Sequence, residues 1–292
     1  MEEIVYLNGS LVPRSKARIS IDDHGFLYGY GLFETMRTYK GKYFLLDRHI
    51  ERLKSSAEVI GLAGKLKDIN LEKACRDTLK VNDVKDGRVR VTVTNGAITT
   101  QPWIDSGGKP TVLVTTRPYA PFSKEKTDAG FKVGIASVRR MKQSVFSAMK
   151  SINYLSNVVA RMEAAAKGLD ETILLNDEGY IAEGGGSNVF FVREGRLITP
   201  ALNSGIIPGV TRGVVIELVG GLGISMSEGP VGIGVIKKCE EVFMTNAMIE
   251  IMPVTAICDN EGNTVTISGG KAGEITRKLM KAYKERVEKE TG

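Results

Sequence analysis

Three consecutive glycines, Gly184 to Gly186, follow Glu183 and stand between two short runs of apolar residues. The runs at 172–176 and 188–193 are rich in β-branched and aromatic side chains, which is typical of paired strands. Because glycine has no Cβ, a glycine turn lets the backbone come close to a flat ligand while one carboxylate stands beside that ligand. This stretch therefore predicts strands joined by a tight turn at a candidate binding site.

Strand and helix patterns alternate along the rest of the chain. Strands are predicted at 4–7, 32–39, 88–94 and 111–116 in the first part, and at 132–138 and 241–245 in the second. Apolar residues at helical spacing predict helices that begin at Asp47 and Leu71, and further helices at 152–167, after Pro208-Gly209, and at 271–290. The pattern indicates a mixed α/β (α+β) fold.

Proline and charge are concentrated between Pro118 and Asp128, where the hydrophobic periodicity lapses. A chain of 292 residues can bury a large core, and two packed domains are the expected arrangement. We therefore expect a small N-terminal α/β domain over residues 1–120, a linker over 121–128, and a larger C-terminal domain over 129–292.

The charge balance is mild, since 40 Lys and Arg against 34 Asp and Glu leave a net charge of +6. The basic residues are spread along the chain without a long block, so no nucleic-acid partner is expected. No apolar run approaches the roughly 18 residues of a membrane span, and the N-terminus lacks the features of a signal peptide. The expectation is a cytoplasmic protein with no membrane partner.

Three cysteines, Cys75, Cys239 and Cys258, are far apart, and His24 and His49 are the two histidines. This spacing indicates neither a disulfide framework nor a zinc site, and two histidines leave little material for a metal centre or a Ser-His-Asp triad. No metal is expected.

Lys150 follows the apolar stretch 145–149 and stands directly before a predicted helix start at Ser151. A lysine held between two such elements can be partly desolvated, which lowers its pKa and suits it to Schiff-base chemistry. The alternative is an ordinary solvated lysine. Glu183 adds to the first interpretation, because a carboxylate beside a pyridinium nitrogen keeps that nitrogen protonated in a pyridoxal phosphate site. The alternative there is an exposed glutamate in a glycine turn, and the G-x-G-x-x-G pattern of a dinucleotide site is absent.

A candidate phosphate site follows at 205–212, where a Pro-Gly turn opens a predicted helix. Amides at a helix N-terminus, together with the hydroxyl of Thr211, suit a phosphate monoester. Arg52, with His49 one turn earlier on the same helix face, could add a guanidinium fork. An ordinary helix start and a surface charge are the plain alternatives.

Taken together, six stretches resemble, in order, the successive motifs of class IV aminotransferases, the fold-type-IV pyridoxal phosphate enzymes. They are DHGFLYGYGLFE (23–34), RHIERL (48–53), KSINYLSN (150–157), EGGGSNVF (183–190), PGVTR (208–212) and MTNA (244–247). The family comprises branched-chain aminotransferases, D-amino acid aminotransferases and aminodeoxychorismate lyases. The resemblance covers nearly the whole chain and implies the two-domain D-amino acid aminotransferase-like fold, in a homodimer whose partner subunit contributes a loop to the active site.

The resemblance also implies residue roles. Lys150 would form the internal aldimine and then shuttle the proton, Glu183 would pair with the pyridinium nitrogen, and Tyr154 would hydrogen-bond the phenolic oxygen of the cofactor. The remaining residues that it implies for the cofactor are Arg52, Gly186, Ser187, Asn188, Val210, Thr211, Asn246 and Ala247. Those that it implies for the substrate pocket are Tyr28, Phe33 and Thr35.

The subfamily features point in different directions. Thr35, and the pair Asn246-Ala247, resemble the lyase pattern, whereas the motif 183–188 stands between the branched-chain and D-amino acid forms. The loop 95–109 lacks the Arg-x-His pair of the D-amino acid enzymes. A tyrosine four residues after Lys150 favours a branched-chain type. Arg88 and Arg90 also favour the branched-chain type, since alternation places both side chains on one face of a strand, where one of them could bind the substrate carboxylate. The alternative is that both arginines belong to a salt-bridged strand edge.

We therefore expect a homodimeric pyridoxal phosphate aminotransferase that exchanges an amino group between an amino acid, with branched-chain L-amino acids favoured, and 2-oxoglutarate by a ping-pong mechanism. D-amino acid transamination and pyruvate elimination from aminodeoxychorismate are the alternatives on the same fold. A non-catalytic binding module is a further alternative, but such a module has no need of Lys150, Glu183 and Arg52 together.

Overall fold

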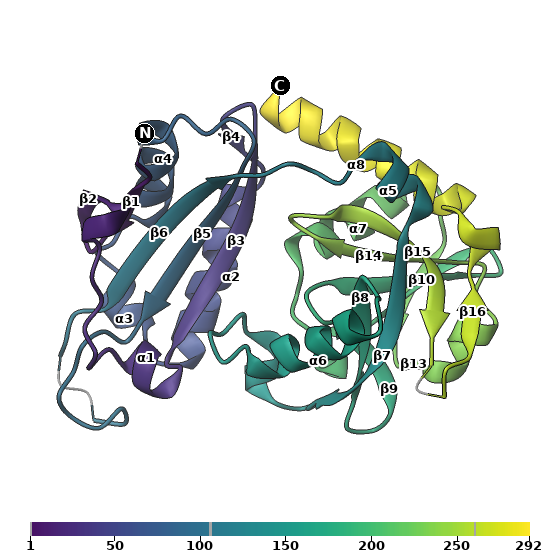
Figure 1. The fold of residues 1–292 in the computed structure, drawn as a ribbon, viewed down its shortest axis with the longest axis horizontal. Helices are drawn as coiled ribbons and strands as arrows, with labels where there is room; N and C mark the ends of the chain where they lie inside the picture. Colours follow the sequence, from purple (N-terminus) through teal and green to yellow (C-terminus); the bar gives the residue numbers. More distant parts are fainter. Residues whose placement is uncertain (1, 105–106, 260) are drawn as a thin grey trace. The chain divides into compact units, whose positions relative to one another are not determined.

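The structure, a computed structural model, describes residues 2–104, 107–259 and 261–292, so positions 105 and 106 of the loop 95–109 lie outside the described residues. The chain forms two compact units (Figure 1). Unit 1 comprises Met1–Ala120, Met149–Asn153 and Glu290–Gly292, and unit 2 comprises Pro121–Ala148 and Tyr154–Lys289. The segment that contains Lys150 therefore belongs to unit 1.

Unit 1 is built on a six-stranded antiparallel sheet in the order β2-β1-β6-β5-β3-β4. Its strands are β1 (Ile4–Leu7), β2 (Ser10–Pro13), β3 (Gly31–Tyr39), β4 (Lys42–Tyr43), β5 (Gly87–Thr94) and β6 (Thr111–Pro118). Its helices are α1 (His24–Tyr28), α2 (Leu46–Val59), α3 (Ala63–Leu66) and α4 (Leu71–Val81). The turn between β1 and β2 has positive φ at Asn8 (49°) and Gly9 (97°), which these two residue types adopt readily.

The two faces of this sheet differ in chemistry because side chains alternate along each strand. Val89, Val91 and Val93 of β5 are fully buried in a core that they share with apolar residues of α2, α3 and α4. Figure 1 shows α2 running along the sheet. Arg88, Arg90 and Thr92 of β5 lie on the opposite face, which they share with Phe33 and Thr35 of β3.

Unit 2 is built on a ten-stranded mixed sheet in the order β12-β11-β10-β14-β15-β7-β8-β9-β13, with β16 paired to β15. Its strands are β7 (Phe131–Arg140), β8 (Glu171–Asn176), β9 (Tyr180–Gly184), β10 (Asn188–Arg193), β11 (Arg196–Pro200), β12 (Met226–Gly229), β13 (Val231–Gly232), β14 (Glu241–Asn246), β15 (Glu250–Cys258) and β16 (Thr264–Thr266). The helices are α5 (Lys124–Ala129), α6 (Leu155–Ala166), α7 (Val210–Gly221) and α8 (Glu274–Thr291), the last of which ends in unit 1.

The core of unit 2 is formed by inward-facing residues of the central strands, among them Phe191, Met244 and Val254. The rings of Phe190 and Phe243 stack with centroids 4.9 Å apart on directly opposed positions of β10 and β14. Helix α6 packs against β7 and β8, and α7 packs against β14. This packing places the start of each of these helices near strand ends that carry candidate site residues.

Residues 121–128, predicted as a linker, are grouped with unit 2, and most of them form a short helix, α5, which Ser123 caps by accepting a hydrogen bond from the amide of Lys126. Its residues are all solvent-accessible, which explains why the sequence pattern resembles a polar connection. The helix expected at 152–167 begins later, at Leu155, because Ser151 pairs with Leu32 of β3 in an isolated β-bridge.

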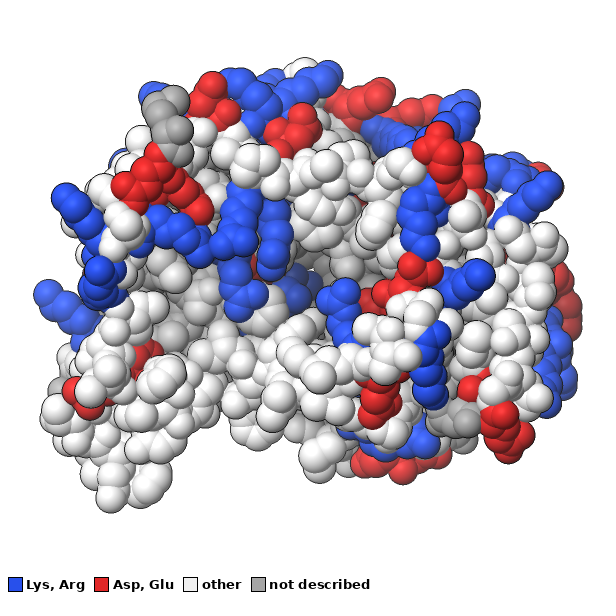
Figure 2. All heavy atoms as spheres, viewed as in Figure 1, with Lys and Arg blue, Asp and Glu red and all other residues white. Residues whose placement is uncertain are grey.

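Among the described residues, no helix is both long and apolar enough to cross a membrane. Within the same residues, no group of three or more His, Cys, Asp or Glu side chains is arranged to hold a metal ion. Figure 2 shows Lys and Arg side chains interspersed with Asp and Glu over the visible face.

Candidate active site

Lys150 is attached to strand β3 by backbone hydrogen bonds. The amide of Phe33 donates to the carbonyl of Lys150 (2.9 Å), and the amide of Ile152 donates to the carbonyl of Gly31 (3.0 Å). The ammonium nitrogen of Lys150 lies 4.5 Å from the centroid of the Phe33 ring, and the residue is half-buried. Lys150 is therefore partly removed from solvent and lies beside an aromatic ring of unit 1.

Arg90 lies against the same ring. Its guanidinium carbon is 3.8 Å from the Phe33 centroid, and its Nε donates to the hydroxyl of Thr92 (3.1 Å). Thr35 stands directly opposite Arg90 in the β3–β5 register, so the side chains of Phe33, Thr35 and Arg90 share one face. The structure thus brings Lys150 together with three of the residues expected to line the substrate pocket.

Arg88 lies two residues before Arg90 on β5 and has different cross-strand neighbours. It stands opposite Arg37 on β3 and Arg117 on β6, and the side chains of Arg88 and Arg117 are exposed. Arg37 is buried, with its guanidinium carbon 4.5 Å from the Tyr39 ring centroid. Of the two arginines proposed from the sequence, Arg90 is the one grouped with Lys150.

Tyr28 lies on α1 with 54% of its surface exposed, and its ring meets that of His24 edge-on, with centroids 5.2 Å apart. The structure does not group it with Phe33 and Arg90, so its place in a substrate pocket stays a prediction.

Arg52 has a partner that the sequence did not indicate. Its Nε and Nη2 donate to the two carboxylate oxygens of Glu34, each at 2.7 Å, and His49 Nδ1 lies 2.8 Å from the same carboxylate. Strand alternation points Glu34 toward α2, where His49 and Arg52 are one helical turn apart. The fork expected to hold phosphate therefore binds Glu34, and contact of Arg52 with a phosphate stays a prediction.

These three side chains form a buried ionic cluster. Burial alone would raise the pKa of the Glu34 carboxyl, but the Arg52 charge and the His49 hydrogen bond lower it to about 2. Burial lowers the pKa of His49 and outweighs the effect of its bond to Glu34, and the nearby charges of Arg52 and Lys150 lower it further. The cluster therefore contains an anionic glutamate, a cationic arginine and a neutral histidine near neutral pH.

Glu183 is buried at the end of β9 in unit 2, with 3% of its surface exposed. Its Oε1 lies 3.1 Å from Nη2 of Arg140, and its Oε2 accepts hydrogen bonds from the amide of Ile207 (3.0 Å) and from Nδ2 of Asn188 (3.3 Å). The carboxylate is therefore held by a cation and two neutral donors.

Arg140, at the end of β7, was not identified from the sequence. Its Nε donates to the carbonyl of Gly205 (3.0 Å), and its Nη2 donates to the carbonyl of Ser147. The pairing with Glu183 depends on β7, β8 and β9 being neighbours in the sheet, and no local spacing shows this. The only sequence signal was two basic residues at the end of a predicted strand.

The glycine turn after Glu183 gathers other expected cofactor residues. The hydroxyl of Tyr154 donates to the carbonyl of Gly185 (3.2 Å), and Nδ2 of Asn246 donates to the carbonyl of Gly186 (2.9 Å). Burial raises the pKa of Tyr154, so its hydroxyl keeps its proton near neutral pH. A Cβ at Gly184 would lie 2.3 Å from Oγ of Ser187, so a larger residue there would force the Ser187 hydroxyl to move.

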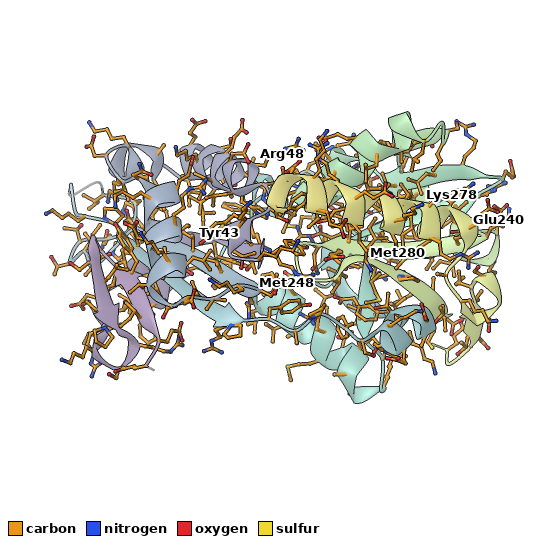
Figure 3. All side chains as sticks on the ribbon, turned by 90° about the horizontal axis from the view of Figure 1, so that it is seen from above. Tyr43, Arg48, Glu240, Met248, Lys278 and Met280 are labelled. Atoms are coloured by element: carbon orange, nitrogen blue, oxygen red, sulfur yellow. The ribbon has the colours of Figure 1, made fainter. Side chains whose placement is uncertain are left out.

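Helix α7 begins beside this turn. A Cβ at its N-cap, Gly209, would lie 2.0 Å from Oδ1 of Asn188, so the helix start lies directly against β10. Val210 and the buried Thr211 form the first turn of α7. Ala247 lies in the turn after β14. In this turn Oδ1 of Asn246 accepts hydrogen bonds from the amides of Met248 (2.8 Å) and Ile249 (2.9 Å), and Met248 is labelled in Figure 3. The expected phosphate-binding segments of unit 2 are thus brought together, whereas Arg52 belongs to unit 1.

Comparisons with known proteins agree with this geometry. A model of the amino-transferase class IV family matches residues 31–257. A provisionally named branched-chain-amino-acid aminotransferase of Methanocaldococcus jannaschii is 37% identical over 282 residues, which is 96% of this chain and 95% of the relative. The chain belongs to the class IV aminotransferase family. It is a pyridoxal-phosphate-dependent aminotransferase, as predicted.

Other relatives in the family differ in reaction. An aminodeoxychorismate lyase of Bacillus subtilis is 36% identical over 287 residues (97% of this chain, 94% of the relative).

Among solved structures, the branched-chain aminotransferase of Escherichia coli superposes with a TM-score of 0.89 at 27% identity and covers 100% of this chain and 97% of that one. The branched-chain aminotransferase of Thermoproteus uzoniensis with norvaline gives 0.85 at 30% identity (99% and 96% covered). The predicted fold class is confirmed.

Unit 2 of this class IV aminotransferase contains polar groups that fit pyridoxal phosphate. The hydroxyls of Ser187 and Thr245 are buried and make no hydrogen bond within the described residues. Thr245 stands opposite Asn188 in the β10–β14 register, on the face that Asn188 presents to the start of α7. Buried hydroxyls normally have a partner, and the oxygens of a phosphate beside the α7 amides would provide one.

Proposed function

We propose that the enzyme is a homodimeric aminotransferase that moves the amino group of a branched-chain L-amino acid to 2-oxoglutarate by a ping-pong mechanism. The observation that carries the proposal is the group formed by Phe33, Arg90 and Lys150. It places an aromatic surface and a guanidinium beside the amine expected to react. One pocket can then accept an apolar side chain from the donor and a carboxylate from the acceptor.

When bound, pyridoxal phosphate supplies an electron sink for the carbon that loses its proton. The role proposed for Lys150 is to hold the cofactor covalently between reactions and then to move a proton with its amine nitrogen. Glu183, held by Arg140, Asn188 and the Ile207 amide, would present an oriented carboxylate to the pyridine nitrogen. A fixed anion at that position stabilises the protonated ring without reorganisation during the reaction.

The other side chains would bind and orient. Tyr154, whose hydroxyl keeps its proton, would hydrogen-bond the phenolic oxygen of the cofactor. The amides of Val210 and Thr211, together with Arg52 and the Asn246-Ala247 turn, would hold the phosphate. Gly186, Ser187 and Asn188 would form the wall next to the ring. These assignments follow from the family resemblance.

A homodimer is supported by an apolar stripe on α6. Leu155, Val158, Val159 and Met162 recur at helical spacing with 73%, 42%, 38% and 65% of their surfaces exposed. Phe146, shortly before α6, is 65% exposed. Exposed apolar area of this kind on a folded protein marks an interaction surface, and a second copy of the chain is the occupant that we propose. Sedimentation should give a dimer in the wild type and a monomer in Met162→Asp, and a wild-type monomer would refute this assignment.

Location in the cytoplasm remains a prediction from the sequence.

Aminodeoxychorismate lysis is the second candidate function. It is supported by the B. subtilis relative and by Thr35 and Asn246-Ala247, which resemble the lyase pattern.

A panel of amino donors tests the proposal. Purified holoenzyme is incubated with L-valine, L-leucine or D-alanine and 2-oxoglutarate, and glutamate formation is measured. Pyruvate release from aminodeoxychorismate is followed in parallel. We expect turnover with the two L-amino acids. Turnover of D-alanine alone, or pyruvate release without transamination, would overturn the branched-chain assignment and select one of the alternatives.

A further inference from the structure

Glu171 is a buried acid for which the mechanism above has no role. It is the first residue of β8, and 4% of its surface is exposed. Burial raises the pKa of its carboxyl, although the Arg161 charge, the hydrogen bond from the Thr172 amide and the nearby backbone of Gly185 and Gly186 act in the opposite direction. Because burying a carboxylate is unfavourable unless its oxygens are well bonded, its presence here calls for a specific reason.

The carboxylate of Glu171 lies directly against the glycine turn. A Cβ at Gly185 would be 2.7 Å from its Oε1, and a Cβ at Gly186 would be 3.7 Å from its Oε2. Oε1 also accepts the amide of Thr172 (3.0 Å), and Nε of Arg161 on α6 lies 3.9 Å from it. Both oxygens of one side chain therefore face the backbone of a turn that has no side chains of its own.

The carbonyls of the same turn bind residues of the proposed cofactor site. The carbonyl of Gly185 accepts hydrogen bonds from the hydroxyl of Tyr154 (3.2 Å) and from Nδ2 of Asn157 (2.9 Å). The carbonyl of Gly186 accepts from Nδ2 of Asn246 (2.9 Å). Since a peptide unit is planar and trans, holding the amide of Gly186 fixes the direction of the Gly185 carbonyl. Glu171 thereby determines where Tyr154 finds its acceptor.

We propose that Glu171 is a positioning residue for the cofactor site. Its carboxylate packs against Gly185 and Gly186 and so fixes the peptide between them, whose carbonyl is the acceptor of Tyr154. The inference rests on the proposed role of Tyr154, and it adds a residue that touches neither cofactor nor substrate.

Glu171→Gln is the direct test. Glutamine has the same size but carries no charge, and it replaces one acceptor oxygen with an NH₂ group that cannot accept the turn amides. Titration of the apoprotein with pyridoxal phosphate should show a dissociation constant raised by about tenfold, which corresponds to the loss of one charge-assisted hydrogen bond. The matched control is Glu163→Gln, an exposed carboxylate of the same unit that accepts the amide and hydroxyl of Ser137, and it should leave the constant unchanged.

A double variant distinguishes positioning from a general effect on stability. If Glu171 acts through the acceptor of Tyr154, then Glu171→Gln and Tyr154→Phe together should raise the dissociation constant by less than the product of their separate effects. The melting temperature of apo Glu171→Gln should equal or exceed that of wild type, because an unfavourable buried charge is removed. Fully independent effects, or an unchanged dissociation constant in Glu171→Gln, would overturn the inference.

Arg161→Gln provides a second test that does not alter the buried carboxyl. The Arg161 side chain is 55% exposed, so the fold tolerates its replacement. Arg161 and Tyr154, from α6 and the segment before it, are the charged and titratable groups that the described residues place against Glu171. Without the Arg161 charge the carboxyl takes up its proton at a higher pH, so affinity for the cofactor should begin to fall at a higher pH than in wild type. Superimposable pH profiles would overturn the inference, whereas a wild-type protein that binds no pyridoxal phosphate would instead refute the proposed function.

Discussion

Replacement of Glu34 by glutamine tests the buried ionic cluster of unit 1. Glu34 is fully buried, with Arg52 on both oxygens and His49 on one. Its pKa falls from 4.5 to about 2 in the folded protein. Each unit of difference corresponds to about 1.4 kcal/mol, so the interactions of the ionised carboxylate contribute about 3 kcal/mol to stability. Removing one partner of a buried ion pair has a similar measured effect, about 3–5 kcal/mol.

The pH dependence follows from the direction of the shift. Because the pKa of folded Glu34 is depressed, the unfolded chain takes up a proton between about pH 4.5 and pH 2 that the folded chain does not. The stabilisation is fully present above pH 4.5 and is lost as the pH falls toward 2. His49, whose pKa is also lowered, adds a loss of stability that begins when the pH falls below its usual value of 6.5.

The assay is chemical denaturation of the apoprotein followed by circular dichroism, at pH 7 and at several lower pH values. Hydrogen exchange of the α2 amides provides a local measurement in unit 1. Glu34→Gln should lose about 3 kcal/mol at pH 7 and should show a shallower decline below pH 4.5 than wild type. Glu51→Gln, an exposed carboxylate on the same helix, is the control and should behave like wild type. A Glu34→Gln variant as stable as wild type at pH 7, or with the same acid decline, would refute the reasoning.

Three further predictions concern the cofactor site. Lys150→Ala should lose turnover by orders of magnitude, and borohydride should attach the cofactor to Lys150 in wild type; mass spectrometry that finds another modified lysine would contradict this. Glu183→Gln should still bind pyridoxal phosphate but should slow the single-turnover reaction with amino donor by about 10²-fold, and an unchanged rate would mean that the pyridinium partner is another residue. Gly209→Ala should weaken cofactor binding, because its Cβ would lie 2.0 Å from Oδ1 of Asn188, whereas Gly220→Ala in the same helix, with nothing within 4 Å, should leave binding unchanged.

Much of the local structure was predictable because its signals lie within a few residues. The Asn8-Gly9 turn, the alternation along β5 and the apolar periodicity of α2 each report a backbone preference that does not depend on the rest of the chain. The family motifs likewise pointed to Lys150 and Glu183 from the sequence alone. Element ends were less predictable, as at the start of α6, because a bridge to β3 extends Ser151.

The partners of the candidate residues were decided only by the tertiary structure. Glu34 and Arg52 are 18 positions apart, and the sequence shows two charges of opposite sign but not that β3 packs against α2 with those charges facing each other. Arg140 and Glu183 meet because β7, β8 and β9 are adjacent strands, and Glu171 reaches the glycine turn for the same reason. Backbone preferences act over a few residues, whereas an ion pair in the core depends on which elements pack together. The sequence by itself indicated the family and the candidate residues, because their motifs are local, and the packing of strands and helices decided which side chains contact them.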